Sequence, residues 1–281
     1  MSAIPISFPG AGLRTPRWAT VFAWLALLPI LVAAVAPELL TSASPILINP
    51  LHALLPPGGD HWFGTDQLGR DLFTRVVHGA RPSLLLGLGA TVLAVVAGSL
   101  LGVLAALGGR VTDQVVGRAL DVLLSLPQLL LALLVITVLG GGVANVVIAI
   151  ALAFTPGYAR MVRTEAMVVR RSGYVEAARG LGLPPTVLVA RHVLPNAVGP
   201  LLVLATVGFG TALIAGSGLS FLGFGVQPPA PEWGAMLSEG RDFLGDAWWL
   251  GLFPGAAITI TVVAVNVLGR AAQRRYTRRT V

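Results

Sequence analysis

Charged residues are scarce in this chain: Asp, Glu, Lys and Arg make up 11% of its 281 residues, against about 25% in soluble domains. Apolar residues make up 55%. Too few polar side chains remain to cover the surface of a water-soluble globule of this size. The composition therefore predicts a fold embedded in lipid.

Cysteine and lysine are both missing. The absence of cysteine excludes disulfides, thiolate metal sites and cysteine nucleophiles. The absence of lysine excludes the G-x-x-x-x-G-K-[ST] loop that binds nucleotide phosphates, so we expect no ATP site in this chain. The four histidines have no metal-ligand spacing, and we expect neither a metal site nor a catalytic centre. They are His52, His61, His78 and His192.

Long stretches without charged residues predict six membrane-spanning helices, because about 20 apolar residues cross the hydrocarbon core. The expected spans are residues 18–37, 82–109, 122–139, 143–162, 199–222 and 247–269. The first could instead be a cleaved signal peptide. Its apolar stretch is longer than the usual signal core of about 7–15 residues, so we expect a retained helix. Six spans put both termini on the same side.

The arginines predict the orientation. Only Arg70, Arg75, Arg81 and Arg241 fall on the side opposite the termini, and the other fifteen of the nineteen basic residues share the side of the termini. Cytoplasmic loops carry the excess of positive charge, so both termini are expected in the cytoplasm. The net charge of +7 then indicates topology and affinity for anionic lipid, rather than nucleic-acid binding.

Two outer segments are expected, at residues 38–81 and 232–246. The first should be irregular up to Asp60 and then form a short surface helix over Asp71–Ala80. In the second, tryptophans 233, 248 and 249 are expected near the lipid interface, where aromatic residues gather.

Three features within the spans bear on packing. Gly98 and Gly102 form a small-xxx-small pair, which predicts close approach of another helix. Pro127 is one of four prolines that permit kinks. Asp121, at the inner end of the third span and close to Arg118, is either a functional acid or, as we expect, a side chain reaching the interface.

The polar loop between the fourth and fifth spans suggests docking. Ser172 can cap a short helix, Gly182 suits a left-handed turn, and Pro184 can start a second short helix. Glu176 stands beside the small side chains of Ala177 and Ala178, a patch that fits into a partner's groove. The residues alone do not decide between a loop that docks on a partner and a loop that is only solvated.

Six sequence blocks, taken together, resemble a known family. The series Glu176-Ala177-Ala178, Gly182 and Leu194-Pro195 resembles the EAA loop of bacterial ABC importer permeases. The other blocks match the C-type permease of dipeptide, oligopeptide and nickel importers. They are Gly64–Asp71, Gly79–Arg81, Pro156–Arg160, Leu219–Pro229 and Glu232–Gly234. The resemblance runs from about His61 to Gly269.

This resemblance implies an all-α, polytopic fold with six transmembrane helices, the type I ABC importer permease fold, in the inner membrane. It implies three parts: residues 1–80, a permease core at 81–270 with a cytoplasmic coupling loop at 163–197, and a tail at 271–281. The sequence departs from the family at this point, because Arg270 and an arginine-rich tail follow Gly269 where relatives usually carry an aspartate.

The resemblance also implies partners: a second permease, two cytoplasmic ATPases that bind ATP and magnesium, and an extracytoplasmic solute-binding protein. Glu176, Ala177, Ala178 and Gly182 would form the coupling helix that sits in an ATPase cleft. Asp66, Arg70 and Asp71 would be an outer docking or gating element, or only local turn and helix-start chemistry. The residues that contact cargo cannot be assigned.

The functional hypothesis is therefore the permease half of an ATP-driven importer of di- or oligopeptides, with nickel or another small solute as the alternative cargo. A secondary transporter of a different class would need membrane-embedded charges for ion coupling, which this chain nearly lacks. A membrane enzyme has no supporting constellation of nucleophile, base or metal.

Overall fold

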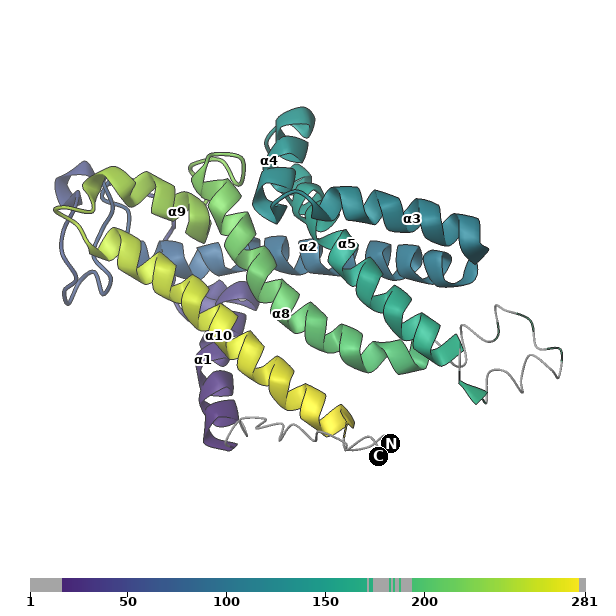
Figure 1. Cartoon of the computed structure of the whole chain (residues 1–281). Helices are drawn as coiled ribbons and strands as arrows, with labels where there is room; N and C mark the ends of the chain where they lie inside the picture. The colour runs from purple at the N-terminus through teal and green to yellow at the C-terminus, as the bar shows by residue number, and fades with distance from the viewer. Residues whose placement is uncertain are drawn as a thin grey trace, which may run out of the picture.

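The computed structural model describes residues 17–170, 172–173, 182, 184, 187 and 194–277. Five helices in this part are long and apolar enough to cross a membrane, and Figure 1 shows their arrangement. They are α1 (Arg17–Val35), α2 (Leu72–Leu107), α5 (Val143–Arg170), α8 (Leu194–Phe221) and α10 (Trp249–Thr277). Five of the six expected spans are thus confirmed as helices, and α5, α8 and α10 extend past the expected limits.

The expected third span, residues 122–139, is not one continuous helix. The chain instead forms α3 (Gly109–Leu124) and α4 (Gln128–Leu139), bent by 95° at the break, and α4 points away from the direction of α3 (Figure 1). Pro127 lacks an amide donor and disfavours helical geometry in the residue before it. The 12 residues of α4 cover only about 18 Å.

The expected surface helix at Asp71–Ala80 is also wrong as a separate element, because it continues without a break into the second span. The resulting helix α2 has 36 residues and contains Pro82. Proline removes one backbone donor, but tertiary contacts keep the outer turns in line. Leu72, Val77 and Ala80 are buried in one apolar cluster with Trp233 of α9 (Trp233–Gly240).

Close packing of α2 on α5 confirms the small-residue prediction. A Cβ atom at Gly98 would lie 2.5 Å from Cβ of Tyr158, and one at Gly102 would lie 2.6 Å from the carbonyl oxygen of Ala159. Glycine at both positions therefore lets the two backbones approach more closely than any other residue allows.

The outer tryptophans differ in their surroundings. Trp248 is 55% exposed, as an interfacial residue would be, but Trp233 and Trp249 are 1% and 5% exposed and pack inside the protein. The indole of Trp249 donates to the carbonyl of Thr65 over 3.0 Å. Two of the three expected interfacial tryptophans therefore fix the outer segments to the bundle.

Candidate functional site

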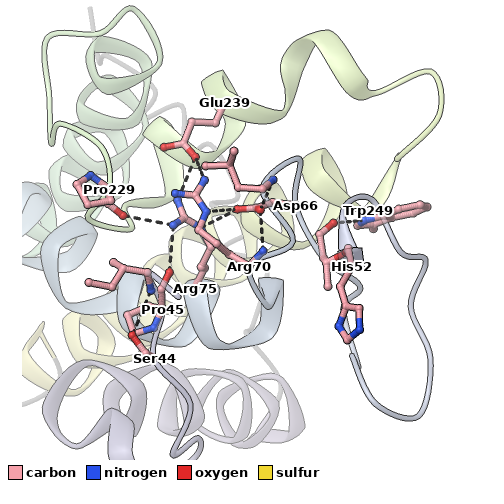
Figure 2. Close-up of polar contacts among 12 residues, drawn as sticks. Ser44, Pro45, His52, Asp66, Arg70, Arg75, Pro229, Glu239 and Trp249 are labelled. Carbon is pink, nitrogen blue, oxygen red and sulfur yellow. Dashed lines mark hydrogen bonds and ion pairs between the residues drawn. The ribbon is translucent and has the colours of Figure 1, made fainter. Parts of the chain in front are cut away.

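Four buried or partly buried charged residues meet at the end of the bundle that is expected to face outside, and they are called here the outer charge cluster (Figure 2). They are Asp66, Arg70, Arg75 and Glu239. The side chains of Arg70, Arg75 and Asp66 are 2%, 1% and 4% exposed, and that of Glu239 is 17% exposed. Two positive and two negative groups balance one another, which buried charges require.

The distances in the outer charge cluster are those of charge-assisted hydrogen bonds. Arg70 donates to Asp66 and to Glu239, each over 2.6 Å. Arg75 donates to the same Glu239 oxygen over 3.1 Å, and its Nε lies 3.4 Å from Asp66. Each guanidinium thus contacts both acids, so the four residues form one network.

Arg75 also ties two loops to the cluster. One terminal nitrogen donates to the carbonyl of Pro45, over 3.2 Å, and to that of Pro229, over 3.3 Å. Pro45 lies in the first outer segment, and Pro229 lies in the loop that follows α8. The cluster therefore joins the first outer segment, the start of α2, the loop after α8 and α9 into one platform.

A tight turn holds the carboxylate of Asp66 in position for the outer charge cluster. Its carboxylate accepts the backbone N–H groups of Leu68 and Arg70, both over 2.9 Å. Gly69 has φ +71, and a Cβ there would lie 1.8 Å from the carbonyl oxygen of Asn49. Only glycine fits this position, both for its backbone angle and for its contact.

Asp71 begins α2. Its carboxylate accepts the backbone N–H of Thr74 over 2.8 Å and the hydroxyl of Thr74 over 2.7 Å. His61 lies 2.9 Å from the other carboxylate oxygen. The side chain therefore acts as a helix cap that satisfies an amide at the start of α2.

A second polar junction fixes α9. Glu232 is 1% exposed and accepts the hydroxyl of Ser83 over 2.8 Å and the N–H groups of Gly234 and Ala235, over 3.0 and 2.9 Å. Gly79 leaves room for the indole of Trp233, since a Cβ there would lie 3.1 Å from it. Separate sequence blocks thus meet at this junction.

Sequence reasoning found part of the outer site and missed the rest. Asp66 and Arg70 lie inside the protein, while Asp71 caps a helix; their docking or gating role stays a prediction. Arg75 was read only as a topology signal, and Glu239 was not singled out. One available signal was the presence of arginines on the side where the positive-inside rule disfavours them.

The half of the bundle that leads to the loop after α5 carries two ion pairs between α3 and α5. Arg163 donates two hydrogen bonds to Asp113, over 2.5 and 2.8 Å. Arg160 donates to Asp121, whose side chain is 62% exposed. The ion-pair partner of Asp121 is therefore on α5. These pairs join α3 to α5, the helix that precedes the predicted coupling loop.

The predicted coupling residues are described only in part. Glu176, Ala177 and Ala178 lie outside the described residues. Gly182 has φ +80, the left-handed geometry that the sequence predicted for it. The hydroxyl of Ser172 donates to the carbonyl of Val169 over 2.6 Å. The ATPase-docking role of the loop therefore stays a prediction.

Comparison with known proteins finds a family to which this chain is similar. A family model described as the inner membrane component of binding-protein-dependent transport systems matches residues 98–281. The dipeptide transport system permease protein DppC of Alkalihalophilus pseudofirmus is 43% identical over 85% of this chain and 79% of its own length. The glutathione transport system permease protein GsiD of an Escherichia coli strain is 44% identical over 76% of this chain and 70% of its own length.

Solved structures share the fold. A structure of the MetNI methionine ABC transporter in an inward-facing conformation matches with a TM-score of 0.60, covering 72% of this chain and 95% of the compared chain. A crystal structure of an amino acid ABC transporter matches with a TM-score of 0.54, covering 74% and 95%. The identities are 19% and 18%, so this likeness concerns the arrangement of helices alone.

Proposed function

Since this chain belongs to the family of inner membrane components of binding-protein-dependent transport systems, we propose that it is the permease subunit of an ATP-driven importer of short peptides. The observation that carries this proposal is the 43% identity, over 85% of the chain, to a dipeptide transport system permease. Peptide, rather than nickel, is also the cargo class that other similar permeases are named for.

The cargo-moving unit would be a heterodimer of this chain and a second permease. Five long apolar helices and a broken one place the chain in the inner membrane as a multi-pass protein. One copy forms one wall of a pathway, and the second permease supplies the other. The arginine-rich ends and loops would lie in the cytoplasm.

Energy would enter through the loop that follows α5. Two cytoplasmic ATPases bind ATP and magnesium, and the segment with Glu176, Ala177, Ala178 and Gly182 docks on one of them. Closing of the ATPases pulls on α5, and the ion pair from Arg163 to Asp113 of α3 carries the movement into the bundle. A solute-binding protein delivers the peptide on the outer side, above the platform that the outer charge cluster holds together.

Uptake by the complete reconstituted complex tests the cargo. The complex is placed in liposomes with the binding protein outside and ATP inside, and uptake of labelled dialanine is followed with and without excess nickel ions. We expect uptake of dialanine that nickel does not compete away. Uptake of labelled nickel with no uptake of dialanine would contradict the peptide proposal and support the alternative cargo.

A further inference from the structure

The ion pair between Asp121 of α3 and Arg160 of α5 lies open to its surroundings. The two side chains are 62% and 55% exposed. The neighbouring pair of Asp113 and Arg163 is more covered, at 25% and 31%. Two similar pairs between the same helices thus differ in exposure, and the more exposed one needs a separate explanation.

The exposed pair lies within the helical bundle and not at its tip. Ala159, next to Arg160, packs its backbone beneath Gly98 and Gly102 of α2, and α2 continues inward to Leu107. At a rise of about 1.5 Å per residue, this level is roughly 8–14 Å before the inner end of α2. Asp121 is followed on α3 by apolar residues, of which Val122 is 66% exposed.

Lipid is an unfavourable neighbour for this pair. Charged side chains in membrane helices are costly when they face hydrocarbon, and they usually face a water-filled cavity or the interior of a bundle. The pair borders a hollow of about 120 Å³ lined by Gly117, Leu120, Asp121, Arg160 and Arg163. A hollow of this size is smaller than usual ligand pockets, so it does not enclose a peptide by itself.

The chemistry of the pair matches a peptide with free ends, which carries one ammonium and one carboxylate. A guanidinium such as that of Arg160 binds carboxylates with two parallel hydrogen bonds, and the carboxylate of Asp121 accepts from an ammonium. One internal ion pair can therefore open and form two pairs with the peptide. The net charge of the site does not change during this exchange.

We propose that Asp121 and Arg160 line the inner part of the translocation pathway and exchange their mutual ion pair for the charged ends of a passing peptide. This inference rests on the proposed function, since it names the residues that the cargo would meet. Asp113 and Arg163 serve a different purpose: their two-fold hydrogen bond, over 2.5 and 2.8 Å, holds α3 on α5.

Absence of cysteine from the chain makes thiol labelling a clean test. Complexes that carry Asp121→Cys or Arg160→Cys are each assembled with the partner subunits in liposomes. If one variant fails to assemble, the labelling rates of the other still test the proposal. Sulfonate and trimethylammonium thiosulfonate reagents stand in for the carboxylate and ammonium of a peptide. Each labelling rate is divided by the rate at which the same reagent labels a free thiol. Labelling is measured without nucleotide and with the ATPases closed on ATP.

We expect two results. Labelling slows at least tenfold when the ATPases close, because the pathway shuts on the inner side. Asp121→Cys, which frees Arg160, favours the sulfonate reagent about fivefold, and Arg160→Cys, which frees Asp121, favours the trimethylammonium reagent. Ile260→Cys on α10, at a position 44% exposed among apolar residues, is the control and should label slowly in both states.

Two outcomes would overturn the inference. Equal labelling in both nucleotide states would mean that the pair only reaches the water at the inner interface. No labelling in either state would mean that the second permease or lipid covers it. Failure of dialanine uptake by the unaltered complex would instead count against the proposed function, while the labelling rates would still show whether the pair lines the pathway.

Discussion

The side chains of Arg70 and Arg75 are almost completely buried, with 2% and 1% of their surface exposed. Their position is stable because Asp66 and Glu239 supply two carboxylates within hydrogen-bond reach. Removing one cation leaves an uncompensated buried anion, which is far more destabilising than losing an exposed pair. The outer platform is therefore sensitive to single substitutions.

Arg70→Met should lower the free energy of unfolding in detergent micelles by about 3–5 kcal/mol, since it leaves Asp66 and Glu239 with one cation fewer. Arg241→Met is the matched control. Arg241 pairs with Asp242, and the two side chains are 60% and 73% exposed, so we expect a change below about 1 kcal/mol. Equal effects of both substitutions on denaturant unfolding would contradict the role given to the outer charge cluster.

At the scale of the helices, α2 and α5 pack through glycines. Gly98→Ala should destabilise the protein by about 1–3 kcal/mol, because the new methyl group overlaps Tyr158 and the backbone of Ala159 in a close-packed contact. Gly157→Ala, on the same pair of helices, has no atom within 4 Å of its Cβ. It should be neutral or stabilising by up to about 1 kcal/mol. Opposite signs in denaturant unfolding would confirm this packing; the same sign would count against it.

The predicted coupling loop provides a second test at this scale. Gly182→Val should reduce ATP-driven dialanine uptake at least tenfold, because φ +80 is strained for a β-branched residue and the docking segment would change shape. Gly173→Val is the control, since Gly173 has an ordinary φ and, among the described residues, no neighbour within 4 Å of its Cβ. Copurification of the ATPases with each variant is the second measurement. Full uptake and ATPase retention by Gly182→Val would show that this turn plays no part in docking.

The local sequence predicts the helices, but it does not predict the bends and contacts that connect them. Uncharged runs of suitable length predicted the spans because crossing hydrocarbon depends on length and composition. Pro127 signalled a possible kink, yet its neighbours did not fix a bend of 95°. The unbroken course of α2 through Pro82 depends on Trp233, which bonds to the carbonyl of Val76. Glu239 meets Arg75 across a similar separation in sequence, and no local pattern reports such contacts.

At the scale of the whole molecule, charge divides the chain into two ends. In the expected topology, fifteen of the nineteen basic residues share the side of the termini and of the loop after α5. The outer end holds Arg70 and Arg75 in internal ion pairs. This division predicts which end faces the cytoplasm.

Labelling of single cysteines checks the orientation. Asp60→Cys lies in the first outer segment and should react with a membrane-impermeant maleimide in cells whose inner membrane is intact. Arg270→Cys, near the end of α10, should react only after the membrane is opened. The reverse pattern would place the termini outside and would remove the predicted docking loop from the ATPases.

The central claim is that this chain is a passive gate of a peptide importer, driven from the cytoplasm by separate ATPases. Its most direct test is dialanine uptake into liposomes that contain this chain alone, this chain with the second permease, or the complete complex with binding protein and ATP. We expect uptake only by the complete complex, and only with ATP inside the liposomes. Uptake by the chain alone, or uptake that does not need ATP, would contradict the account.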